Sequence, residues 1–227
     1  MKTKTICLAF FLLMGSLYTA HAQQRFNAGI RLGANFCQID GDQMSGYNMG
    51  GLVAGVFVSY PFNSRWEGQF EMLFSQKGSQ RVIDSIPQPG LWDLLRINYL
   101  EVPLMVNCKL TPRFKLSGGL GLGYMISNHF EGMSNYIRDN VDFITKLEFN
   151  GTLGAQYYIS PRFSIFGRFT YSLLGINKPQ SGIPGYISST AFYFYDSGMA
   201  NNVISFGLYY SFLKNKFPDK PVKKNQR

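Results

Sequence analysis

Charged side chains that could support chemistry are spread along this sequence at alternating positions. Each lies in a segment where every second residue is apolar, on the face opposite to the apolar one. Charges of opposite sign that share an interior are expected to pair, because an isolated buried charge is costly. The pattern predicts a structural ion-pair network, with a conducting path as the alternative. Its predicted members are Arg31, Glu71, Lys77, Glu101, Lys115, Glu148 and Arg168.

Histidine chemistry is restricted to one position, since His129 is the only histidine after residue 22. Ser127, Ser134, Asp139 and Asp142 lie in the same predicted loop. A catalytic base needs a nucleophile within hydrogen-bond reach and a group that orients it, and nothing in this spacing requires either. We therefore predict a solvated loop histidine, no catalytic residues and a protein that is not an enzyme.

Metal and cofactor sites are not predicted either. After residue 22 the sequence has two cysteines, Cys37 and Cys108, which are expected at opposite ends of the fold and beyond disulfide reach. No histidine or further cysteine accompanies them, as a metal site would require. We predict two unpaired thiols, no metal and no cofactor.

An aromatic run is the candidate binding site. Phe192, Tyr193, Phe194 and Tyr195 follow a Gly/Pro/Ser-rich segment at residues 179–189. Clustered exposed aromatic residues are typical of binding surfaces. Two interpretations remain open: the run extends the last hairpin above the membrane, or it forms an extracellular recognition surface.

Strands are the elements that must position these side chains. In residues 98–126 two long segments flank a short turn at 111–113, and side chains alternate between an apolar face and a small or polar face. Such long strands, apolar on one side only, are typical of transmembrane β-strands. The other predicted strands are 26–36, 50–60, 66–77, 146–159, 163–174 and 202–212.

The connections between these strands alternate in length. Three are tight turns with Pro or Asn, and four are long. This plan predicts an all-β fold, an eight-stranded antiparallel up-and-down transmembrane β-barrel in the outer membrane, with both termini periplasmic. A soluble lipid-carrying barrel is the alternative, but only 15% of residues are charged, which is low for a soluble surface. Pro103 falls within a strand, where we expect a local bulge.

The two ends of the chain differ from its body. Residues 1–22 have a basic start, a short apolar core and a small-residue cleavage site, as in a signal peptide. Residues 214–227 form a basic tail of net charge +5, expected to be disordered and periplasmic, and residues 23–213 form the barrel domain with only +2. The basic character is therefore a property of the tail, and no nucleic-acid partner is predicted.

Three stretches resemble the PorT-like outer-membrane β-barrel family of Gram-negative bacteria. They are GYNMGGLVAGVFVS at residues 46–59, FEMLFSQKGS at 70–79 and YLEVPLMVNCKL at 99–110. The resemblance implies an integral outer-membrane barrel, and the family's founding member is associated with protein secretion. GLYYSF at 207–212 is similar to the aromatic-ended signal that barrel-assembly machinery reads, although here the chain continues beyond it.

The predicted function follows from these features. We expect a non-enzymatic module that binds or scaffolds a partner, in protein secretion or envelope assembly. The alternative is a stand-alone surface barrel for adhesion or ligand binding through its long extracellular loops. The expected partners are outer-membrane lipid and an envelope or secretion protein.

Overall fold

The computed structural model describes residues 26–42, 46–81, 92–132, 136–139, 143–177 and 198–215. The predicted signal peptide at 1–22, the aromatic run at 192–195 and all but the first two residues of the basic tail lie outside the described residues. Within the described part, no helix is long and apolar enough to cross a membrane.

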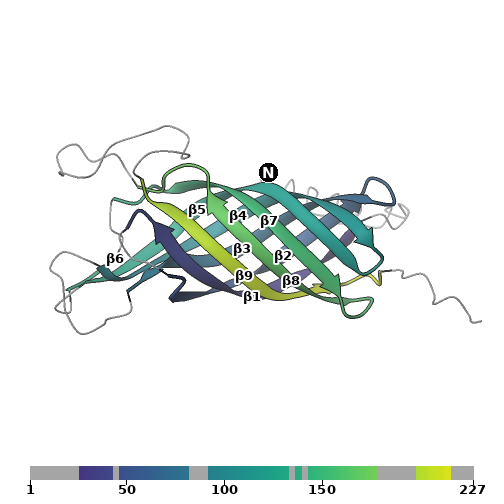
Figure 1. Ribbon diagram of the computed structural model, residues 1–227, viewed down its shortest axis with the longest axis horizontal. Coiled ribbons are helices and arrows are strands. Elements are labelled where there is room, and N and C mark those ends of the chain that lie inside the picture. The colour runs from purple at the N-terminus through teal and green to yellow at the C-terminus, as the bar shows by residue number, and fades with distance from the viewer. Residues whose placement is uncertain are drawn as a thin grey trace, which may run out of the picture.

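Eight long antiparallel strands close into a barrel (Figure 1). Each strand pairs with its neighbours along the chain, and pairing of the last long strand with the first completes the closure. One further strand, β6, is short, lies outside the closed barrel and pairs only with the end of β5. The strands are β1 (Asn27–Asp40), β2 (Met49–Pro61), β3 (Trp66–Gln80), β4 (Trp92–Thr111), β5 (Phe114–Gly132), β6 (Tyr136–Asp139), β7 (Leu147–Tyr158), β8 (Phe163–Ser172) and β9 (Ala200–Ser211).

The wall of the barrel is inverted relative to that of a soluble protein. Large apolar side chains such as Leu52, Leu104 and Leu153 are exposed on the outside. Polar and charged side chains such as Glu71 and Asn107 are buried inside. Successive residues of a strand point to opposite faces, so this inversion follows directly from the alternating sequence. The eight-stranded antiparallel barrel that the sequence predicts is confirmed.

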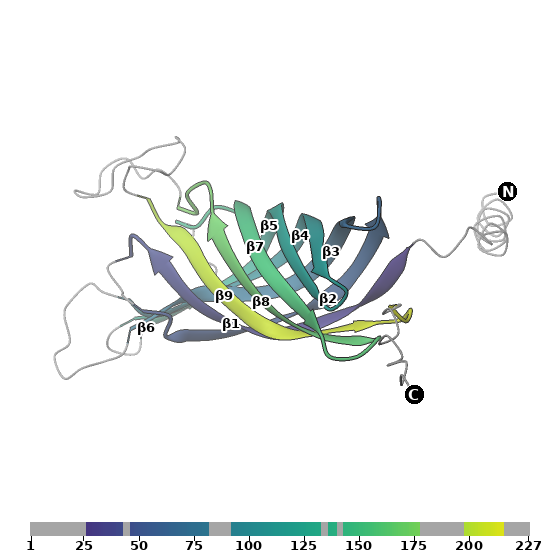
Figure 2. The same cartoon turned by 45° about the vertical axis from the view of Figure 1, so that its right-hand side comes forward.

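The end of the barrel opposite the tight turns extends further than predicted. β1 continues to Asp40, and β5 continues to Gly132 and pairs with β6 beyond the closed wall (Figure 2). Inside this end, apolar side chains form a cluster. Its buried members are Ile39, Leu95, Ile97, Tyr99, Phe130, Ile144, Ile176 and Met199.

The bulge expected at Pro103 is wrong. Pro103 lies opposite Gly121 of β5 without a shift in register. On its other side, β3 and β4 keep the same register from the Phe70–Leu104 pair to the Leu73–Glu101 pair, and only the pairing between them is interrupted. Because proline has no amide hydrogen to donate, the ladder is interrupted there while the register on either side is unchanged.

Candidate functional site: the charged lumen and the two ends of the barrel

The centre of the lumen is organised around the Glu71 carboxylate of β3. It accepts a hydrogen bond from Arg31 Nη1 at 2.9 Å and two from Arg168, at 2.8 and 2.9 Å. The Tyr209 hydroxyl donates to the same carboxylate at 2.7 Å, and Gln69 donates at 2.5 Å. Glu71 is fully buried, so only such a complete set of donors makes its charge tolerable.

A second cluster lies nearer the long connections and has the opposite balance of charge. The Lys77 ammonium, which is buried, forms ion pairs with both Glu101 and Glu148. Ser172 donates to Glu148 at 2.6 Å, and Asn150 donates to Glu101 at 3.3 Å. One lysine with two carboxylates leaves a formal charge of −1 here. Two arginines on Glu71 leave +1 in the central cluster, so the two neighbouring clusters neutralise each other.

A third cluster lies in the lumen near the tight turns. Glu67 pairs with Lys115 at 2.8 Å and with Lys109 at 3.2 Å, and Asn107 donates to Glu67 and to Gln69. The alternation in residues 66–77 places Glu67 inward, but the predicted network omits it. The predicted network also omits Lys109, although this residue shares the inward phase of Asn107 in β4, and that phase marks it as inward.

All seven residues of the predicted network thus face the lumen, in three layers. Glu71 joins Arg31 and Arg168, Lys77 joins the other two glutamates, and Lys115 joins Glu67 instead of a predicted member. Aromatic rings support the arginines. Phe57, Phe166 and Tyr209 form a buried cluster, and the Arg31 guanidinium lies 4.2 Å from the centre of the Phe166 ring.

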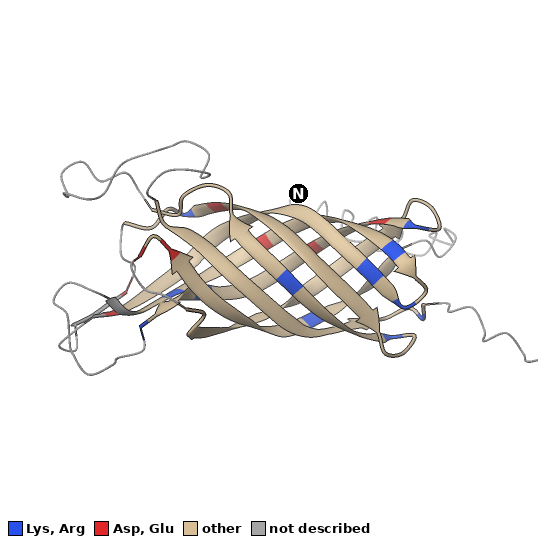
Figure 3. Cartoon of the chain, in the orientation of Figure 1, with Lys and Arg blue, Asp and Glu red and all other residues tan. Residues whose placement is uncertain are grey.

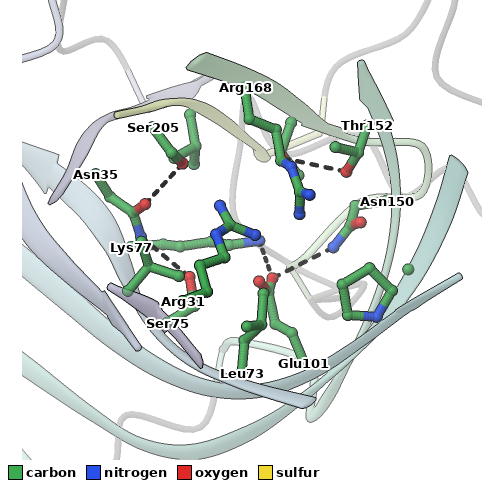
Figure 4. Close-up of a pocket in the computed structure, with 15 residues that line it drawn as sticks. Arg31, Asn35, Leu73, Ser75, Lys77, Glu101, Asn150, Thr152, Arg168 and Ser205 are labelled. Carbon is green, nitrogen blue, oxygen red and sulfur yellow. Dashed lines mark hydrogen bonds and ion pairs between the residues drawn. The ribbon is translucent and has the colours of Figure 1, made fainter. Parts of the chain in front are cut away.

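Little space remains between the first two layers. Figure 4 shows side chains from opposite walls pointing towards one another across a cavity lined by Arg31, Lys77, Glu101 and Arg168. The space open to the centre of a water-sized sphere is about 10 Å³. That is about the minimum for one water molecule and too little for a hydrated ion. Between these two layers the side chains fill the interior, as an eight-stranded barrel allows.

His129 lies on β5 rather than in a loop, which corrects the sequence prediction. Its Nδ1 contacts Asp139 Oδ1 of β6 at 2.5 Å, and its Nε2 contacts Glu131 Oε1 at 2.9 Å. The hydrogen bonds to Asp139 and then to Glu131 raise the pKa of His129 above its ordinary value. With a carboxylate on each ring nitrogen, neither nitrogen contacts a nucleophile among the residues that the structure describes. Ser127 instead accepts a hydrogen bond from Asn98, and Ser134 and Asp142 lie outside the described residues.

The two cysteines are both free. Cys37 is buried in the half of β1 near the long connections, whereas Cys108 lies beside the tight turn after β4. Among the described residues, no group of three or more His, Cys, Asp or Glu side chains is arranged to hold a metal ion.

The family of the chain follows from its sequence. Residues 21–177 match the family described as the outer membrane protein beta-barrel domain. The chain belongs to this family. It is therefore an integral outer-membrane barrel, and its cellular location is the outer membrane. No curated protein matches the sequence.

Solved structures with a similar fold include small outer-membrane barrels. Neisserial surface protein A is 11% identical with a TM-score of 0.52, and the match covers 83% of this chain and 98% of that one. Ail, the attachment invasion locus protein of Yersinia pestis, is 17% identical with a TM-score of 0.49, and the match covers 83% of this chain and 100% of that one. OprG from Pseudomonas aeruginosa is 14% identical with a TM-score of 0.35, and the match covers 83% of this chain and 94% of that one. At these identities the likeness to the neisserial protein supports the fold alone.

Proposed function

We propose that this outer-membrane barrel is a non-enzymatic module that binds or scaffolds a protein partner of the cell envelope, in protein secretion or envelope assembly. The filled lumen carries the proposal. Three layers of ion pairs occupy the interior, and an apolar cluster fills the end near the long connections. A barrel without an open passage has only its two ends and its outer wall to work with. The resemblance to the PorT-like family adds the context of secretion.

The orientation of the barrel is part of this proposal. Asn27 of β1 and Ser211 of β9 lie at the end of the barrel that carries the three tight turns. Short turns face the periplasm in barrels of this class, which supports periplasmic termini. Residues 1–22 would then be a cleaved signal peptide, and the basic tail 214–227 would meet its partner in the periplasm. Intact mass of the purified protein tests the cleavage.

Cross-linking and pull-down from native outer membranes test the partner. Full-length protein is compared with a version that ends at Leu213, and with a length-matched version whose tail lysines and arginine are replaced by Gln. A defined partner that is captured by the full-length protein and lost with either altered tail supports a scaffold held through tail charge. Absence of any partner from all three versions, with the barrel folded, contradicts the proposal.

The second candidate is a stand-alone surface barrel for adhesion or ligand binding. One observation favours it: β4 and β5 continue together beyond the closed wall, and β6 adds a further strand to β5 there. Replacing Phe192 to Tyr195 with Ser tests the predicted recognition surface. Loss of cell or matrix attachment, with envelope secretion intact, would favour this candidate over the scaffold.

A further inference from the structure

The three tight turns share a sequence pattern. Each has a residue with a side-chain oxygen, one intervening residue, an arginine and then an aromatic residue that begins the next strand. They are Asn63-Ser64-Arg65-Trp66, Thr111-Pro112-Arg113-Phe114 and Ser160-Pro161-Arg162-Phe163.

The same hydrogen bonds build all three turns. The side-chain oxygen of the first residue accepts from the backbone amides of both the arginine and the aromatic residue. The distances are 2.8 and 2.8 Å at Asn63, 3.3 and 3.0 Å at Thr111, and 3.4 and 3.1 Å at Ser160. This local bonding fixes the direction in which the chain leaves each turn, so the arginine and its aromatic neighbour occupy equivalent places.

The arginines therefore recur around one rim of the barrel. The three turns connect β2 to β3, β4 to β5 and β7 to β8, and their arginines are exposed. These arginines are Arg65, Arg113 and Arg162. Lys214, also exposed, follows β9, so one cation stands at the end of each pair of neighbouring strands. No acidic residue lies in the three turns. Figure 3 shows basic residues gathered at this end.

The aromatic residues after these arginines face the membrane. Trp66 and Phe163 are about half exposed on the outer wall, and Tyr60, Tyr210 and Phe212 lie at the same level of neighbouring strands. Arg162 donates to the Tyr210 hydroxyl at 3.3 Å. Aromatic girdles of this kind mark the boundary between hydrocarbon and headgroups. The arginines, one residue closer to the turn, are thus placed at headgroup level.

One of the turns borders an apolar groove of about 380 Å³ on the outer surface of β2, β3 and β4. Phe62, from the same turn as Arg65, lies against Gly68, where a Cβ would come within 2.7 Å of its ring. The Lys109 amide donates to the Arg65 carbonyl at 2.7 Å and fixes this turn to β4. Side chains lining the groove include Phe26, Tyr60, Phe62, Phe70, Leu104 and Val106.

We propose that the tight-turn rim binds anionic phospholipid, with headgroup phosphates on Arg65, Arg113 and Arg162 and an acyl chain of the lipid at Arg65 in the apolar groove. A guanidinium matches phosphate through two parallel hydrogen bonds, which favours arginine over lysine for this role. On a wall that faces hydrocarbon, an apolar groove bordered by a turn that carries an arginine fits a lipid, which has an acyl chain and a charged headgroup. The lipid site is separate from the protein partner proposed above.

Lipid selectivity of the full-length protein tests the proposal. The protein is reconstituted in vesicles of phosphatidylcholine with a minority of phosphatidylglycerol, and the lipids retained on it are measured by native mass spectrometry. We expect enrichment of phosphatidylglycerol, roughly fivefold for each arginine that engages a headgroup at low salt. The R65Q/R113Q/R162Q variant should lose the enrichment. The matched variant R81Q/R96Q/K146Q removes three charges near the opposite end and should keep it.

A second pair of variants tests the groove. Val106→Trp fills it, whereas Leu122→Trp places the same side chain on the outer face of β5, away from the groove. We expect Val106→Trp alone to reduce retention of long-chain phosphatidylglycerol relative to a short-chain analogue. Equal retention of phosphatidylglycerol and phosphatidylcholine by the wild type would overturn the proposal. Unchanged enrichment of phosphatidylglycerol in the triple arginine variant would also overturn it. Displacement of the bound lipid by an equal concentration of glycerol phosphate would overturn the role of the groove and leave only a phosphate site.

Discussion

The barrel has two sections whose polarity is opposite. Around Glu71 the inside is charged and the outside is apolar, whereas around Ile97 the inside is apolar and the outside carries His129 and Asp139. The wall is one continuous sheet, so the backbone does not account for the change. The difference follows from the solvent, since hydrocarbon surrounds one section and water the other. Along β4 the inward positions keep a period of two between the sections, whereas in β5 a register shift at Ile126 brings Asn128 and Phe130 inward. The chemistry on each face is exchanged in both strands.

Removing the central carboxylate tests the charged section and has the largest expected effect. Glu71→Ala leaves Arg31 and Arg168 buried without their shared partner, and we expect the free energy of unfolding to fall by about 3–5 kcal/mol. Urea unfolding in lipid vesicles measures it. Gln80→Ala, at the exposed end of β3, is the control. A loss below about 1 kcal/mol for Glu71→Ala, as for a surface pair, would show that the interior is hydrated.

Truncating a leucine compares the apolar interior of one section with the apolar outer wall of the other. Leu95→Ala leaves a cavity in the apolar cluster, and we expect a loss of about 3 kcal/mol, within the range for buried leucines. Leu122→Ala faces lipid, which can fill the space, and should lose less. The same unfolding assay measures both variants. Equal losses would contradict a change of solvent between the two sections.

An introduced charge locates the boundary between the sections. Leu120→Arg places a cation on the lipid face near mid-membrane, and we expect a loss of about 2–4 kcal/mol. His129→Arg adds no such penalty because water surrounds that part of β5. Unfolding in vesicles of two thicknesses sharpens the result, since only Leu120→Arg should respond to thickness. A large penalty at position 129 would place the extension inside the membrane.

Protonation of His129 gives the smallest expected effect. Its carboxylate partners raise its folded-state pKa. The resulting support for the pairing of β5 with β6 is therefore complete below the ordinary pKa of about 6.5 and is lost as pH rises through the raised value. Amide hydrogen exchange of β6, corrected for intrinsic rates, should show protection that falls on the alkaline side. His129→Gln should remove this pH dependence, and protection that persists unchanged would contradict the assignment.

Much of the barrel could be predicted from the sequence because one rule governs the membrane section. Alternation fixes which face each residue occupies, so the strands and inward positions such as Glu71 and Arg168 follow from it. Partner choice does not follow, because it depends on which strands lie across the lumen. Lys115 meets Glu67, which is 48 residues away.

The features that the sequence does not predict lie beyond the membrane section, where an apolar outer face no longer marks the strands. In β1 and β4 the apolar cluster keeps the period of two of the membrane section, but Ile39 and Leu95 occupy the face that is polar elsewhere. Residues in the connections, such as Ile144 and Ile176, have no period at all and join the cluster only through the fold. The sequence predicts a loop at His129 because the extension of β5 has no apolar outer face to mark it as a strand.

Conductance in planar lipid bilayers tests most directly the central claim that the lumen is a structural plug and the protein acts by binding. Purified full-length protein is reconstituted, with folding verified by its resistance to unfolding in the same lipid. The account predicts no discrete current steps from the wild type, because paired side chains fill the space between the charged layers. Regular current steps from the folded wild type, altered in size by Lys77→Gln, would show an open path through the lumen and contradict the account.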